Sequence, residues 1–192
     1  MSQSSAEAYS VSLRGTVAGA AFTALTAVGA YISIPIGPVP IVLQNFFVLL
    51  AGLLLGPKKA LASITIYLLL GAVGLPVFAG GTGGIGHFFG PTGGYLAGFL
   101  PAALITGLLS PVYRGEGKVS LVRCILALSA GTAAIYLIGI PWLKIATNAT
   151  WAQSFMIGLV PFIPGDIVKI LAASFTGRSI LPRFQLFLHG GG

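Results

Sequence analysis

Asp166 and Lys169, in the last apolar stretch of the chain, are the side chains best suited to bind a polar ligand. They are three positions apart, so on a helix they share one face. If this stretch crosses a membrane, each charge near its middle costs about 2.5–3.5 kcal/mol, and an ionisable residue there indicates a functional site. Lys169 could bind an anion while Asp166 accepts hydrogen bonds. The alternative is an ion pair that only neutralises itself.

A glycine-rich segment, residues 80–94, is the second candidate. Gly81, Gly83 and Gly86 match the spacing G-x-G-x-x-G, but an apolar run precedes them where a dinucleotide-binding fold needs a strand. Non-helical backbone at membrane depth is tolerated where it lines a cavity, so we expect a cavity-lining outer loop that includes Gly84. A plain connecting loop is the alternative.

Other reactive residues are too scattered to form a catalytic or metal site. The acids Glu7, Glu116 and Asp166 give neither a triad nor a carboxylate pair. His87 and His189 are isolated, and we expect His87 on the surface of an outer loop. Lys118 follows Gly117 without the rest of a phosphate-binding loop. We therefore expect no enzyme activity, no metal and no cofactor.

The composition places the chain in a lipid bilayer. Of 192 residues, 56% are apolar and only 7% are charged, whereas soluble domains carry about 25% charged residues. One span needs about 20 apolar residues, so the chain holds about six. We expect an all-α integral membrane protein with six transmembrane helices, in which residues 1–192 form one membrane domain with a helical core over 13–183.

Proline, glycine and charge divide the chain into these spans. A polar lead-in over 1–12 precedes the first span, a run that could also be read as a signal peptide. A short outer or re-entrant piece reaches 160, and a polar loop covers 110–118. A glycine-rich tail follows 188. The expected spans are 14–34, 41–56, 60–77, 95–109, 121–143 and a last one from about 164.

The basic residues set the expected orientation. Alternating ends put eight of the ten on one side, so both termini should be cytoplasmic. The net charge of +7 then needs no nucleic acid, because anionic lipid suffices. The proline- and glycine-rich loops 34–40, 80–94 and 144–164 fall outside, and the site should open there.

Small and polar residues mark two further surfaces. Ala20 and Ala24 are four apart on the first span, a spacing that lets helices approach closely, either within the chain or on a partner. Gln44 and Asn45 begin the short second span. They could line the pocket or hydrogen-bond a neighbouring helix.

Three segments carry a resemblance to a known family. The chain resembles the BioY family in residues 38–44 (PVPIVLQ), 78–99 (FAGGTGGIGHFFGPTGGYLAGF) and 162–169 (FIPGDIVK). BioY proteins are biotin-binding S components of energy-coupling factor (ECF) transporters. The resemblance covers about 13–183 and implies vitamin capture in a prokaryotic cell membrane. It also implies partners, namely a membrane-embedded coupling subunit and two ABC-type ATPase subunits.

The resemblance also implies roles for particular residues. Asp166 and Lys169 would help to hold biotin, the loop containing Thr82 and Gly84 would contribute to the pocket, and Tyr95 would line it. Several relatives carry asparagine where this chain has Thr82, and some carry a basic residue at Leu96. The Ala20–Ala24 face would dock on the coupling subunit. Which end of biotin meets Asp166 or Lys169 stays open.

Other functions remain alternatives. A stand-alone facilitator would move biotin or another small vitamin without ATPases, and uptake in a host without coupling subunits would reveal it. Internal repeats would favour a facilitator, and none is clear. An intramembrane enzyme lacks paired catalytic groups. A purely structural membrane protein would gain no thermal stability from a ligand.

Overall fold

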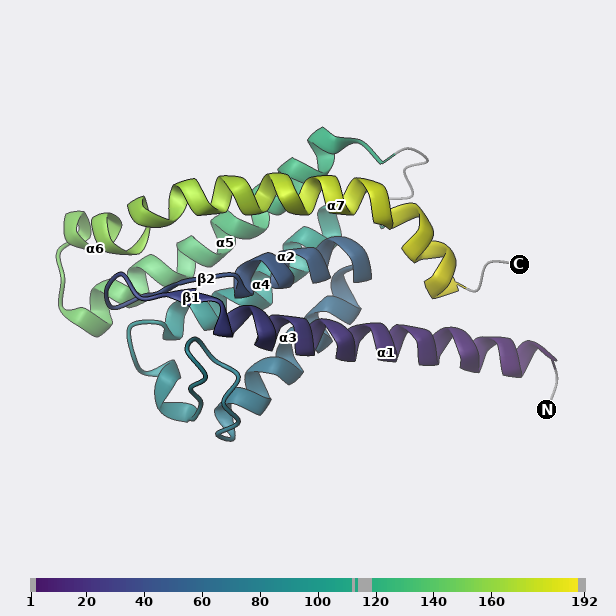
Figure 1. The fold of residues 1–192 in the computed structure, drawn as a ribbon, viewed down its shortest axis with the longest axis horizontal. Helices are drawn as coiled ribbons and strands as arrows, with labels where there is room; N and C mark the ends of the chain where they lie inside the picture. Colours follow the sequence, from purple (N-terminus) through teal and green to yellow (C-terminus); the bar gives the residue numbers. More distant parts are fainter. Residues whose placement is uncertain (1–2, 112, 114–118, 190–192) are drawn as a thin grey trace.

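The computed structural model describes residues 3–111, 113 and 119–189. Seven α-helices account for most of the described chain (Figure 1): α1 (Gln3–Tyr31), α2 (Gln44–Leu55), α3 (Pro57–Ala72), α4 (Gly93–Leu109), α5 (Leu121–Thr147), α6 (Trp151–Gly158) and α7 (Ile163–His189). Most of the expected polar loop (112 and 114–118) and the glycine-rich tail (190–192) lie outside the described residues.

The helices follow the expected apolar runs, with differences at their ends. α1 begins at Gln3 and so takes in most of the polar lead-in, and α7 continues to His189. α5 reaches Thr147, where Asn148 closes it in the left-handed conformation with φ of 52°. Thr150 and Gln153 form a capping box that starts α6. The short outer piece before Pro164 is therefore a helix of its own.

The described residues also contain two short strands, so the fold is mostly helical and not all-α as expected. β1 (Ser33–Ile34) pairs antiparallel with β2 (Ile41–Val42). The prolines and glycine between the two strands turn the chain back. A 3-10 helix, η1 (Ile85–Phe88), lies within the glycine-rich loop, and a second, η2 (Val160–Phe162), joins α6 to α7.

Among the described residues, three stretches are long and apolar enough to cross a membrane. They are Leu13–Tyr31, Leu121–Thr147 and Trp151–Leu188, and the shorter apolar helices are Gln44–Leu55 and Gly93–Leu109. The ends of the chain lie at one end of the molecule, and the β1–β2 pair and α6 lie at the other (Figure 1).

The core forms where α4 packs closely on α5. A Cβ on Gly98 of α4 would lie 3.0 Å from the Cα of Ile135, which is tighter than most such contacts, so glycine favours this close approach. Leu49, Leu53, Leu128 and Leu143 are almost fully buried in the same core. The close α4–α5 pair is a firm support for Tyr95 and Tyr136, which project from these helices toward the site.

Candidate ligand-binding site

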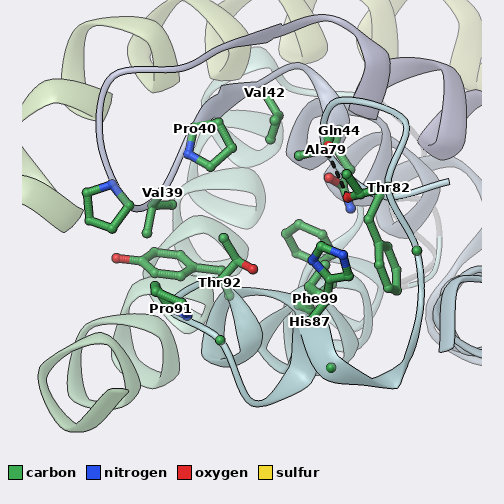
Figure 2. A pocket seen from close by; sticks show the side chains of 17 residues that line it. Val39, Pro40, Val42, Gln44, Ala79, Thr82, His87, Pro91, Thr92 and Phe99 are labelled. Carbon is green, nitrogen blue, oxygen red and sulfur yellow. Dashed lines mark hydrogen bonds between the residues drawn. The ribbon is translucent and has the colours of Figure 1, made fainter. Parts of the chain in front are cut away.

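A cavity of about 470 Å³ lies beside the β1–β2 pair (Figure 2). Three segments wall it: the chain that leads into and through β2, the glycine-rich loop, and the first turns of α4. Its lining is mainly apolar and includes Val39, Phe78, Tyr95 and Phe99, with polar side chains from Gln44, Thr82, His87 and Thr92. An apolar hollow with a few polar anchors is typical of a small-molecule site.

Tyr95 is held rigidly in the wall of this cavity. Its hydroxyl donates a hydrogen bond to the carbonyl oxygen of Gly158, 2.9 Å away. A Cβ on Gly139 would come within 2.6 Å of the Tyr95 ring, and a Cβ on Gly158 would collide with its hydroxyl. Glycine at both positions lets the ring fit between α5 and α6, which fixes one face of the cavity.

Asp166 and Lys169 lie behind that wall, near the start of α7. Asp166 falls in the first turn, as expected, where the helix dipole favours a negative charge. The Lys169 Nζ lies 3.4 Å from Asp166 Oδ1, and the two side chains are only 11% and 8% exposed. The pair is therefore formed within the chain. Lys169 lines a small hollow of about 50 Å³ that shares Val39, Pro40, Val42, Tyr95 and Phe99 with the main cavity.

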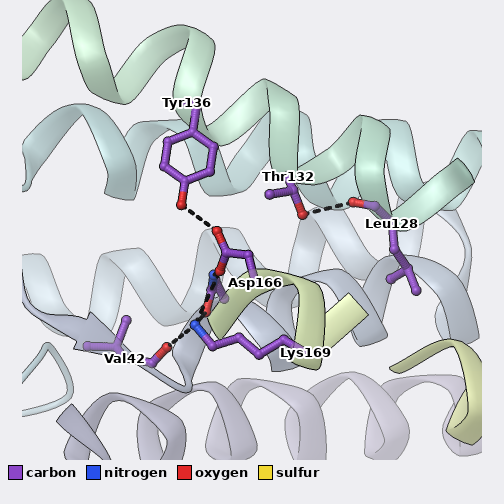
Figure 3. Close-up of polar contacts among 7 residues, drawn as sticks. Val42, Leu128, Thr132, Tyr136, Asp166 and Lys169 are labelled. Carbon is purple, nitrogen blue, oxygen red and sulfur yellow. Dashed lines mark hydrogen bonds and ion pairs between the residues drawn. The ribbon is translucent and has the colours of Figure 1, made fainter. Parts of the chain in front are cut away.

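Each charge of the pair is satisfied by partners in the protein (Figure 3). Lys169 Nζ donates to the Val42 carbonyl oxygen at 2.8 Å and to Asn45 Oδ1 at 2.9 Å, besides Asp166. Asp166 accepts from Asn45 Nδ2 at 3.0 Å and from the Tyr136 hydroxyl. All three ammonium donors are engaged. A ligand in the main cavity would have to replace one of these partners to meet Lys169.

The expected site residues therefore separate into three groups. Gln44, Thr82 and Tyr95 line the main cavity, and Lys169 lines the hollow beside it. Gly84 is not among the lining residues; its backbone N–H instead donates to Gly71 at 2.7 Å and ties the loop to the end of α3. Asn45 bonds a neighbouring helix, one of the two roles considered for it.

Two residues of the site were missed or misplaced by sequence reasoning. His87 was expected on the surface, but its ring lies in the cavity, 5.6 Å from the Phe78 ring. His87 lies in η1 and lines the cavity (Figure 2). Tyr136 on α5 carried no sequence signal beyond being a hydroxyl in an apolar run. Its partner Asp166 is thirty positions away.

A second, larger depression lies between α1 and α3. It has a volume of about 670 Å³ and is mostly apolar. Ala20 and Ala24 line it from α1, and Tyr67 from α3. The small residues thus face open space in the single chain, and they leave room for a partner helix.

Comparison with known proteins places the chain in a family. The family model described as "BioY family" matches residues 1–186. The chain belongs to the BioY family. Family members that it resembles include the probable biotin transporter BioY of Pyrococcus horikoshii, 51% identical over 80% of this chain and 88% of that protein. The biotin transporter BioY of Thermotoga maritima is 41% identical over 84% and 92%.

A solved structure has the same fold. The crystal structure of the S-component for biotin from an ECF-type ABC transporter matches with a TM-score of 0.84 and 31% identity, and the match covers 98% of this chain and 99% of that one. The relatives and the apolar helices together identify a multi-pass membrane protein of a prokaryotic cell.

Proposed function

We propose that this BioY-family chain binds biotin and acts as the substrate-capture subunit of an ECF-type vitamin transporter. The observation that carries the proposal is the 470 Å³ cavity with the buried Asp166–Lys169 pair behind its wall. Biotin is a small apolar bicycle with a ureido group at one end and a carboxylate at the other. An apolar hollow with polar groups at its margins suits such a molecule. The chain is a transport protein and not an enzyme.

We propose the polar contacts to the ligand from the positions of the side chains around the cavity. Gln44, Thr82 and Tyr95 line the cavity and would contact biotin directly. Lys169 would reach the ligand through the shared wall of the small hollow, with Asp166 holding the ammonium in place. Gly84 would act indirectly, because its backbone bond to Gly71 anchors the loop that carries Thr82 and His87. No bound cofactor is needed for capture of this kind.

The proposed topology has six spans, with both termini cytoplasmic. α1, α2, α3, α4, α5 and α7 would cross the membrane, and α6 would lie at the outer face. In Figure 1 the start of α1 and the end of α7 lie at the same end of the molecule, which supports this topology. Alternating spans would also assign eight of the ten basic residues to the cytoplasmic side. Residues 1–192 would form one membrane domain.

The proposed partners are a membrane-embedded coupling subunit and two ABC-type ATPases. The chain's groove between α1 and α3, lined by Ala20 and Ala24, offers a surface for the coupling subunit. Small residues at such a surface let two helices come close, and packing then drives their association in lipid.

Calorimetric titration of biotin into the detergent-solubilised chain tests the function. We expect saturable binding by wild type and a loss of at least tenfold in affinity for Lys169→Ala. Lys144→Ala is the matched control, because Lys144 lies over the Trp151 ring and lines neither the main cavity nor the small hollow. A folded wild-type chain that binds no biotin would contradict the proposal. Equal affinity in both variants would leave biotin binding intact and make Lys169 structural.

A further inference from the structure

We infer that Tyr67 is a positioning residue, which fixes the side-chain amide of Gln44 so that Gln44 Oε1 accepts an N–H donor of the ligand. The inference rests on the proposed biotin function. It assigns the Gln44 side of the cavity to the ureido group, which is the part of biotin that carries N–H donors. Tyr67 itself does not line the cavity.

The direction of two hydrogen bonds sets the orientation of the amide. The Tyr67 hydroxyl lies 2.8 Å from the Val77 carbonyl oxygen. A carbonyl can only accept, so the single hydroxyl proton of Tyr67 goes to Val77. Gln44 lies 2.6 Å from the same hydroxyl. Because that proton is already committed, the hydroxyl oxygen must accept from Gln44, and the NH₂ end of the amide must face Tyr67.

The other end of the amide is then an acceptor that faces open space. Within the described residues, no hydrogen bond reaches Gln44 Oε1, and the only fully enclosed side-chain oxygen or nitrogen without a partner is Ser174 Oγ. Gln44 Oε1 is therefore not enclosed. Gln44 as a whole is only 2% exposed, and it lines the main cavity. Its carbonyl oxygen is thus an acceptor at the edge of the ligand space, although the residue as a whole is almost fully buried.

The surrounding packing prevents the amide from adapting. Tyr67 is fully buried, and its ring meets the Phe78 ring edge-on at 5.8 Å. If the Gln44 amide turned over, two acceptors would face each other and the Tyr67 bond would be lost. A buried polar group without a partner is costly, so a ligand with an acceptor at this point is disfavoured. A ligand that presents an N–H at this point is favoured, because the N–H can donate to Gln44 Oε1.

A double-mutant cycle tests this role. Tyr67→Phe removes the hydroxyl and Gln44→Met removes the amide at similar size. We expect each single variant to weaken biotin binding about tenfold. If Tyr67 acts only through Gln44, adding Tyr67→Phe to Gln44→Met should change the affinity less than twofold. Independent, multiplying losses would overturn the inference.

Tyr31→Phe is the matched control. The Tyr31 hydroxyl also donates to a backbone carbonyl, that of Pro76 at 2.6 Å beside Val77, but the described residues show no hydrogen bond between Tyr31 and Gln44. We expect its biotin affinity to equal that of wild type. An equal loss in Tyr31→Phe and Tyr67→Phe would show that any loosening of the loop suffices, and would overturn the inference.

Two further measurements keep the test decisive. Thermal melting in detergent shows which variants fold. If Tyr67→Phe does not, Gln44→Glu replaces it, since glutamate keeps an acceptor oxygen and should bind biotin more tightly than Gln44→Met; no difference would overturn the inference. Failure of folded wild type to bind biotin would instead remove the proposed function itself, whereas binding with an uncoupled cycle removes only the role of Tyr67.

Discussion

Lys169 on α7 donates a hydrogen bond from Nζ to the backbone carbonyl oxygen of Val42, 2.8 Å away. The bond joins helix α7 to strand β2 across 127 positions of sequence. Val42 also lines the main cavity. A single ammonium group therefore ties one wall of that cavity to the last helix.

This contact predicts that the β1–β2 pair loosens when the ammonium is removed. In Lys169→Met, we expect amides of residues 33–42 to exchange with deuterium faster than in wild type, because a short antiparallel pair has few bonds of its own. Hydrogen exchange with peptide resolution measures this. Lys144→Met should leave those amides unchanged, and unchanged exchange in Lys169→Met would mean that the prolines alone hold the pair.

Tyr136 should stabilise the fold through Asp166. Tyr136→Phe removes a hydroxyl donor from the side chain of Asp166, which is only 8% exposed. We expect a loss of about 1 kcal/mol, typical of a hydrogen bond between membrane helices. Thermal unfolding in detergent checks it. Tyr113→Phe is the control, since Tyr113 is 55% exposed. Equal melting of the two variants would assign no stabilising role to the Tyr136–Asp166 bond.

His87 should contribute to ligand affinity. An imidazole can donate to a carboxylate or carbonyl oxygen, and the described residues give its ring nitrogens no hydrogen-bond partner. His87→Phe keeps a flat ring and removes this capacity, so we expect biotin binding to weaken about fivefold. Calorimetry measures the change. Ile85→Phe, in the same turn but 60% exposed, should bind as wild type does; a similar loss there would indicate damage to the loop.

The α1 face should matter for transport and not for capture. Ala20→Leu or Ala24→Leu would fill the groove between α1 and α3. We expect uptake of labelled biotin to fall at least tenfold in cells that contain the coupling and ATPase subunits, with binding to the isolated chain unchanged. Ala21→Leu is the control, because Ala21 is exposed on the same helix but does not line the groove. Normal uptake by both groove variants would exclude this face as the docking surface.

The spacing of residues close in sequence predicted much of the site, but it did not predict hydrogen-bond partners that are far apart in sequence. The three-residue interval of Asp166 and Lys169 predicts their contact, and the pair forms. The polarity of Gln44 and Asn45 at the start of an apolar helix predicts inward or interhelical roles, and both occur. Tyr136 could not be assigned to Asp166, because no periodic pattern links two helices. The apolar runs between proline and glycine breaks predicted where the helices lie.

Contacts made through the backbone were the second feature that the sequence did not predict. The partner of Lys169 is a carbonyl of Val42, and every residue has such a group, so sequence gives no sign of it. His87 was misplaced for a related reason. An isolated histidine in a glycine-rich loop has no pattern that fixes the direction of its side chain, and the structure places it in η1 as a lining residue of the cavity.

Tyr67 lies between two spaces: it is among the residues that line the groove between α1 and α3, and its hydroxyl accepts the hydrogen bond that holds Gln44 at the cavity. A helix that entered the groove and shifted this ring would turn an acceptor in the cavity away from its ligand. Thermodynamic reciprocity requires the converse in equal measure: a ligand that holds Gln44 in place would resist that helix by the same factor. The Tyr67 side chain would thus couple the affinity for the vitamin to the affinity for the partner helix.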